Sequence, residues 1–107
     1  MDFWDEAIDR LIKLNVELNG KGDPARVRYA RFEPDPYLED EWVVHTVWEL
    51  PEPNPGDEVW PLETTSGYRR MLHDCFRDNP WLSASALFRT ADELKDAAHR
   101  RGQLIPA

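Results

Sequence analysis

The segment from Glu41 to Leu50 restricts the possible folds more than any other part of the chain. Its side chains fall into two alternating sets, and this period of two residues is typical of a β-strand. One set contains Trp42 and Trp48, which we expect to be buried together because large aromatic side chains remove the most surface from water. A stiff, proline-rich loop at residues 51–56 follows the strand, and proline cannot donate to a ladder.

A helix and two further strands are predicted around this strand. Apolar side chains recur at helical spacing from Trp4 to Leu18, with Asp2 as the N-cap and Asn19-Gly20 as the stop signal. Residues 26–32 alternate in the manner of a strand. Residues 58–62 predict a third strand, and Pro61 within it requires a position at the edge of the sheet.

The C-terminal part is expected to be mainly helical. Thr65 or Ser66 is positioned to cap a second helix. Residues 81–89 alternate as a strand would, but their Ala and Leu favour a helix, and we expect a helix there with a strand as the alternative. A capping box at residues 90–93 predicts a last helix. Residues 104–106 then form a short apolar tail that either docks or stays free.

This order of elements predicts a single α+β domain over residues 1–107. It would have an N-terminal helix, a small antiparallel sheet of two or three strands, and then two or three C-terminal helices. A chain of 107 residues is long enough to bury a core, and no linker is long enough to separate two domains.

The net charge of −8 argues against direct binding to nucleic acid or to anionic membranes. The apolar stretches are too short to span a bilayer. Cys75 is the only cysteine, which excludes an internal disulfide, and the acidic start lacks the basic residues of a signal peptide. We therefore expect a reduced, cytoplasmic protein.

The negative charge is concentrated in residues 33–63. This acidic block holds ten of the 21 acidic residues and neither Lys nor Arg, whereas the rest of the chain carries 11 acidic and 13 basic residues. Carboxylates steer a basic partner and orient it, and an aromatic side chain supplies packed area. A face that only keeps the domain soluble is the alternative. The predicted partner-binding residues are Glu39, Asp40, Glu41, Glu52, Asp57, Glu58 and Trp60.

These features favour a non-enzymatic protein that binds a basic protein partner, for example a nucleic-acid-binding protein. Small acidic domains of this class include inhibitors, antitoxins, immunity proteins and phage-encoded antagonists, an analogy of class rather than a deduction. A structural subunit of a larger, viral assembly is one alternative.

A second alternative is a small domain that binds an anion or nucleotide, or acts on it as an enzyme, at the start of the second helix. Hydroxyls, a glycine, free amides and two arginines suit an anion there. Simple helix capping beside two solvated arginines explains the same residues. They are Thr65, Ser66, Gly67, Arg69 and Arg70.

No catalytic or metal-binding motif is recognisable, so neither a cofactor nor a metal is expected. His73 and Cys75 are two positions apart on the predicted helix and cannot face one metal together. Cys75 lies on the apolar side of that helix and is interpreted as a core residue. His45, in the middle of its strand, is either a base, a pH switch or simply a surface histidine.

Overall fold

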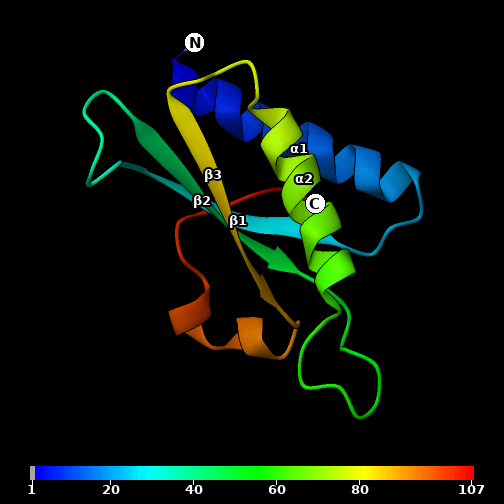
Figure 1. Cartoon of the computed structure of the whole chain (residues 1–107). Coiled ribbons are helices and arrows are strands. Elements are labelled where there is room, and N and C mark those ends of the chain that lie inside the picture. Colours follow the sequence, from blue (N-terminus) through cyan, green and yellow to red (C-terminus); the bar gives the residue numbers. More distant parts are fainter. Residues whose placement is uncertain (1) are drawn as a thin grey trace.

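The computed structural model describes residues 2–107 and is an α+β domain (Figure 1). Two α-helices and four strands make up most of it. In chain order the elements are α1 (Phe3–Gly20), β1 (Arg26–Pro34), β2 (Trp42–Glu49), α2 (Leu62–Cys75), β3 (Leu82–Arg89), the single-turn 3₁₀ helices η1 (Glu93–Lys95) and η2 (Ala97–His99), and β4 (Gln103–Leu104).

The sheet is mixed and has the strand order β3-β2-β1-β4. β1 pairs antiparallel with β2 on one side and with β4 on the other. β2 and β3 run parallel, joined by a crossover that contains α2. The prediction of a purely antiparallel sheet of two or three strands is therefore wrong, because a crossover through a helix is the connection that parallel neighbours require.

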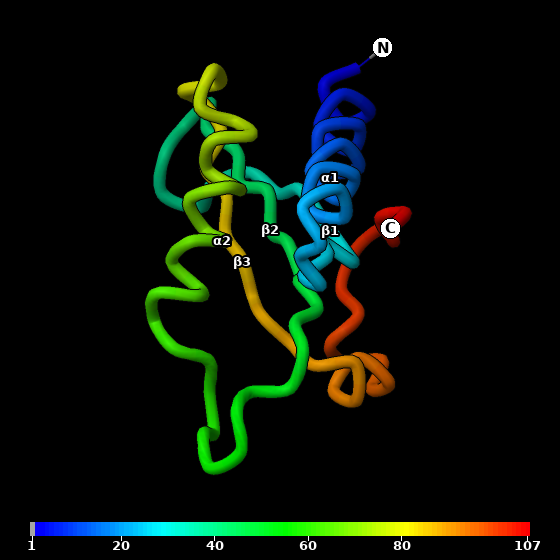
Figure 2. The backbone as a smooth tube through the Cα atoms, turned by 90° about the vertical axis from the view of Figure 1, so that its right-hand side faces the viewer, coloured from blue at the N-terminus to red at the C-terminus, as the bar shows by residue number. Residues whose placement is uncertain are grey.

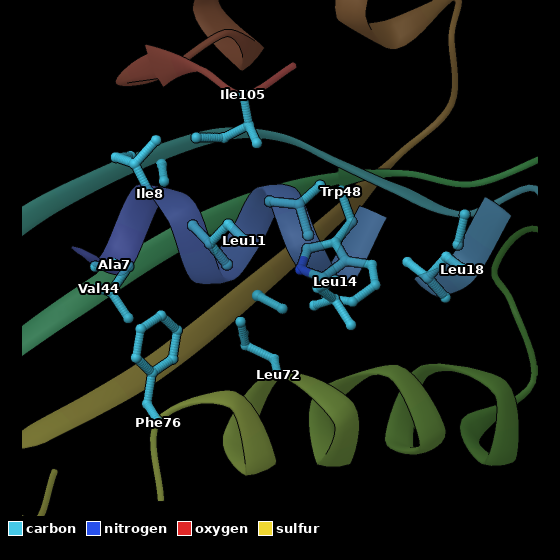
Figure 3. Packing of buried hydrophobic residues seen from close by; sticks show 14 of the residues in the cluster. Ala7, Ile8, Leu11, Leu14, Leu18, Val44, Trp48, Leu72, Phe76 and Ile105 are labelled. Atoms are coloured by element: carbon cyan, nitrogen blue, oxygen red, sulfur yellow. The ribbon is translucent and has the colours of Figure 1, made fainter. Parts of the chain in front are cut away.

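Both helices pack on the same face of the sheet, α1 beside β1 and α2 beside β3. Their apolar side chains meet those of β2 between the layers, where Val44, Trp48, Leu11 and Leu72 lie close together (Figure 3). In the tube view the C-terminal segment returns beside α1 (Figure 2). The opposite face of the sheet carries no α-helix among the described elements.

The first helix forms as its sequence predicts. Asp2 accepts a hydrogen bond from the amide of Asp5 at 2.9 Å and so acts as the predicted N-cap. The buried side chains recur on one face of the helix, which is the apolar stripe seen in the sequence. They are Ala7, Ile8, Leu11, Leu14, Asn15 and Leu18.

Asn15 is a buried polar residue that ties α1 to the sheet and to the C-terminal tail. Its side-chain oxygen accepts from Val27 N at 2.8 Å, and its Nδ2 donates to the carbonyls of Val27 at 2.9 Å and Pro106 at 3.0 Å. Ile105, which is only 1% exposed, packs against the same helix. The tail is thus docked, which the sequence had left open.

Gly102 permits the chain to enter β4. Its φ is 98°, a left-handed conformation that favours glycine. A Cβ at this position would lie 2.3 Å from the carbonyl oxygen of Ala30 in β1, so any other residue would push the two strands apart.

The helix expected at residues 81–89 is wrong, since these residues form β3. The strand pairs with β2 along its whole length, from Trp42↔Leu82 to Glu49↔Arg89. Leu82, Ala86 and Phe88 are buried against the helices, and Ala84 packs partly buried on the same face. Ser83, Ser85 and Leu87 alternate with them, are exposed and face the other side. The alternation was the correct signal, and pairing with β2 overrides the helix propensity of Ala and Leu.

Two other predicted elements also differ. Residues 58–62 are not a strand, because α2 already starts at Leu62 with Pro61 before it. The capping box forms as predicted, with Thr90 N donating to Glu93 Oε1 at 3.0 Å and Glu93 N donating to Thr90 Oγ1 at 3.2 Å. It begins only the short turns η1 and η2, because the chain must cross from the β3 edge to the far edge of the sheet to form β4.

The two strand tryptophans have different environments. Trp48 is fully buried, and its indole N–H donates to Thr46 Oγ1 at 2.9 Å. Trp42, at the start of the same strand, is 41% exposed. The expectation that both are buried is therefore correct for Trp48 alone, since Trp42 lies at the end of the sheet where the helical layer stops covering it.

Candidate functional site

The structure divides the acidic block into two loops at opposite ends of β2 (Figure 1). Residues 35–41 form the hairpin loop between β1 and β2, with Glu39, Asp40 and Glu41. Residues 50–61 form the long loop between β2 and α2. The eight residues of β2 at about 3.3 Å each separate the two loops by roughly 26 Å. The predicted binding residues are therefore not one continuous surface.

The hairpin loop has a defined conformation. Asp35 N donates to Glu41 O at 2.9 Å and closes the loop. The Asp35 carboxylate accepts from the amides of Tyr37 at 2.8 Å and Leu38 at 3.2 Å, in the manner of an Asx turn. Asp40 has a φ of 60°, a conformation that Asp and Asn tolerate better than most residues.

An aromatic cleft lies beside the hairpin loop, at the same end of the sheet. Its volume is about 330 Å³. Four segments form the cleft: the first turn of α1, the end of β1, the start of β2 and the residue before β3. The lining residues are Asp2, Phe3, Trp4, Phe32, Trp42 and Trp81.

The aromatic rings of the cleft support one another. The ring centroids of Trp4 and Phe32 are 3.9 Å apart, and those of Phe3 and Trp81 are 4.4 Å apart. Trp42 N donates to Trp81 O at 2.9 Å, which fixes the backbone of the two tryptophans side by side. Much of this lining is therefore held in place before any partner arrives, which reduces the entropy lost on binding.

The hairpin loop also carries exposed apolar side chains. Tyr37 is 91% exposed and Leu38 is 59% exposed, and Trp42 of the cleft directly follows Glu41. Apolar side chains and carboxylates therefore occur together at this end of the molecule, which we call the hairpin end. A buried apolar centre with a charged rim is the usual anatomy of a protein interface.

The long loop holds the remaining predicted binding residues, Glu52, Asp57, Glu58 and Trp60. They line an open hollow of about 580 Å³. Trp60 is only partly exposed, and its indole N–H donates to the carbonyl of Pro51 at 2.7 Å. This hydrogen bond holds Trp60 against its own loop, where it contributes one aromatic side chain to the hollow, whereas five aromatic side chains line the cleft at the hairpin end.

The predicted anion-binding residues do not lie at a helix start. Helix α2 begins at Leu62, so Thr65, Ser66 and Gly67 are inside it, and Thr65 N already donates to Pro61 O. The free amides on which the prediction depended are absent at these positions. Arg69 turns to β3 and stacks 4.9 Å from the ring centre of Phe88, while Arg70 points away from the core as an exposed residue.

Sequence reasoning missed a chain of hydrogen-bonded side chains on the face of the sheet away from the helices. Arg31 Nη1 lies 2.7 Å from Glu33 Oε2, Glu33 Oε1 lies 2.6 Å from His45 Nε2, and His45 Nδ1 lies 2.9 Å from Ser85 Oγ. The Arg31 guanidinium, and after it His45, holds the pKa of the Glu33 carboxyl below its ordinary value. We call Glu33, His45 and Ser85 the relay.

Only the strand register brings these residues together. Arg31 is directly opposite His45 in the β1–β2 pair, and His45 is opposite Ser85 in the β2–β3 pair. The alternation of each strand, which was visible in the sequence, places the relay residues on one face. Their side-by-side position required knowledge that residues 82–89 are a strand parallel to β2.

Cys75 is a structural residue. Burial raises the pKa of the Cys75 thiol to about 11, as expected for a residue that packs against the core. Within residues 2–107 no three His, Cys, Asp or Glu side chains are arranged to hold a metal ion. In the same part of the chain no helix is long and apolar enough to cross a membrane.

Comparison with family models, with curated proteins and with solved structures found no match to this chain. Fold and surface chemistry alone therefore carry the functional argument.

Proposed function

We propose that this protein is a protein-binding domain that docks a basic partner at the hairpin end. The observation that carries the proposal is the aromatic cleft directly beside an acidic loop that contains no Lys or Arg. Neither feature alone is informative, because acidic loops keep many domains soluble and aromatic residues often belong to the core. Their combination matches what a positively charged, partly apolar segment of a partner requires.

The two features would act at different stages of binding. The carboxylates of the hairpin loop attract a basic partner over a distance and orient it, which raises the association rate. The cleft accepts an apolar or cationic side chain, and its desolvation there slows dissociation. An arginine of the partner is particularly suitable, since its guanidinium stacks on aromatic rings and pairs with carboxylates.

Binding of this kind suits an inhibitor, antitoxin, immunity protein or phage-encoded antagonist. Proteins that bind nucleic acid present basic grooves to the phosphates. An acidic domain that covers such a groove competes with the nucleic acid without binding it. This finer assignment depends on the class analogy as well as on the charge.

Partner capture with two matched charge variants tests the proposal. The hairpin variant carries Glu39→Gln, Asp40→Asn and Glu41→Gln, and the loop variant carries Glu52→Gln, Asp57→Asn and Glu58→Gln. Each removes three negative charges, and Asn tolerates the left-handed backbone at position 40. Tagged forms of both variants and of the unaltered protein are exposed to extract of the native host at low and at high salt.

The proposal predicts a basic protein that the unaltered protein and the loop variant retain at low salt and the hairpin variant does not. Equal loss with both variants would show that only total charge matters. Loss with the loop variant alone would move the docking site to the opposite end of β2. Either result contradicts the proposal.

A further inference from the structure

The relay occupies an uncovered part of the sheet. The segment that contains η1 and η2 covers the other half of this face, so that Val47 is only 4% exposed and a hollow of about 340 Å³ remains between Val47, Leu87 and His99. Towards the hairpin end nothing among residues 2–107 covers Ser85, which is exposed, and the His45 side chain retains 31% of its accessible surface. A small molecule therefore has access to the Ser85 hydroxyl.

The hydrogen bonds of the relay define where its protons lie. Glu33 is ionised, because Arg31 and His45 lower its pKa, and its carboxylate can only accept a hydrogen bond. In neutral His45 the proton is therefore on Nε2, and Nδ1 is left to accept from the Ser85 hydroxyl at 2.9 Å. In this arrangement a carboxylate orients an imidazole, and the imidazole accepts a hydrogen bond from a serine hydroxyl. The same arrangement activates the nucleophilic serine of known hydrolases.

A main-chain donor also lies next to Ser85. The carbonyl of Ser85 points to β2, since it accepts from Thr46 Oγ1 at 2.7 Å. Successive residues of a strand point their main-chain groups to opposite sides, so the N–H of Ala86 points to the free edge of β3. Arg69 Nη2 approaches Ala86 O from that side at 3.4 Å, and no strand of residues 2–107 pairs there. The amide that follows the nucleophile is a common donor to the oxyanion in serine hydrolases.

We propose that the relay is an acyl-transfer site in which Ser85 is the nucleophile, His45 the general base and Glu33 the residue that positions His45. Ser85 Oγ forms a bond to the carbonyl carbon of a carboxylic ester while its proton passes to His45 Nδ1. The bond from that carbon to the leaving oxygen breaks, and the leaving alkoxide takes the proton from His45. The products are acyl-Ser85 and an alcohol, and water attacks the acyl group in the same manner to release the carboxylic acid and restore Ser85.

The shape of the site defines its substrate class. The sheet surface around Ser85 is open, and the hollow beside Val47 and Leu87, two positions further along the same face, holds only about 340 Å³, so the site would accept short-chain esters with good leaving groups. This function is independent of the hairpin end, because its residues face away from the aromatic cleft. Failure of the docking proposal would leave the acyl-transfer proposal intact, and the reverse is equally true.

The experiment uses p-nitrophenyl acetate as the acyl donor and peptide mass spectrometry to assign the acetylated residues over time. Ser83 provides an internal control, because it lies two residues away on the same exposed face of β3. The proposal predicts acetylation of Ser85 in clear excess over Ser83 in the unaltered protein, and Ser83→Ala should leave the Ser85 rate unchanged. Similar labelling of the two serines would overturn the proposal, whatever the variants show.

Two variants separate the roles of His45 and Glu33. A positioned general base contributes about 10²–10⁴-fold, so His45→Gln should slow Ser85 acetylation by at least about 100-fold. Glu33→Gln should lower the rate of Ser85 acetylation, because the amide no longer holds the His45 ring through a charge-assisted hydrogen bond, and it should leave the labelling of Ser83 unchanged. A residue with only a structural role would change the labelling of both serines alike. An unchanged rate in folded His45→Gln, checked by circular dichroism, contradicts the proposal.

Discussion

Arg10 of α1 forms a bidentate ion pair with Asp78, in which Nη1 donates to Oδ1 at 2.6 Å and Nη2 donates to Oδ2 at 3.0 Å. The same guanidinium donates to Cys75 O at 2.8 Å and to Glu6 at 2.9 Å. It thereby connects the first helix to the end of the second, where the chain turns towards β3. Arg10 lowers the pKa of the Asp78 carboxyl, and Asp78 in turn raises the pKa of Arg10.

This pair predicts a pH-dependent contribution to stability. The pKa of Asp78 is lower in the folded protein than its unfolded value near 4. The ionised pair therefore stabilises the fold fully at pH values above the unfolded pKa. This contribution is lost as the pH falls through the lower pKa of the folded protein. Asp78→Asn should therefore lower the free energy of unfolding at pH 7, and the difference from the unaltered protein should shrink in strong acid. Urea unfolding at several pH values measures this. A deficit that does not change with pH would show that the charge of Asp78 is not what matters.

Truncation of the two strand tryptophans should have unequal effects. Trp48 is fully buried, and Trp48→Ala should cost about 3–5 kcal/mol of unfolding free energy. Trp42→Ala should cost less than half as much, since Trp42 is 41% exposed. Denaturant unfolding of both variants checks the ratio. Equal losses would mean that Trp42 is part of the core and not of an accessible cleft.

Asn15 should control the docking of the C-terminal tail. Asn15→Ala leaves the amide and carbonyl of Val27 and the carbonyl of Pro106 without their partner, and a buried unpaired polar group costs about 1–3 kcal/mol. Hydrogen exchange should report the change most directly at the amide of Ile105, which donates to Arg28 O at 2.8 Å. Exchange at Ile105 that is no faster than in the unaltered protein would contradict this role.

Cys75 should react slowly in the native state. Burial raises its pKa from an ordinary value of about 9 to about 11, so at pH 8 it carries roughly 100-fold less thiolate than an exposed cysteine. Its alkylation by iodoacetamide should be slower in about that proportion and should recover in urea. Rapid alkylation of the native protein would show that the thiol is not held against the core.

Features that depend on local patterning could be predicted from the sequence. Residues close in sequence determine three such features. They are the helix that Asp2 caps, the strand that contains Trp48 and the capping box at residues 90–93. Residues 82–89 could not be assigned, because their propensity favours a helix and only pairing with β2 decides for a strand.

The candidate sites could not be predicted from local patterns either. The acidic block is contiguous in sequence, but an extended strand through its middle sends its two halves to opposite ends of the sheet. The aromatic cleft collects residues from four segments, and the relay collects residues from three strands. Neither constellation has a signature at a fixed spacing, so both required the strand order and register.

Chemical shifts of the five tryptophan indole N–H groups test the docking proposal most directly. A short peptide that alternates arginine with leucine serves as the probe, and the ¹⁵N-labelled protein is titrated at low salt. The proposal predicts that the signals of Trp42 and Trp81 move together, while those of the buried Trp48 and of Trp60 stay in place.

The response should be weaker in the hairpin variant than in the loop variant. It should also fade as added salt shortens the Debye length from about 10 Å at 0.1 M to about 3 Å at 1 M. Movement of the Trp60 signal with Trp42 and Trp81 unchanged, or no movement at any tryptophan, would contradict the proposal that the hairpin end is the docking site.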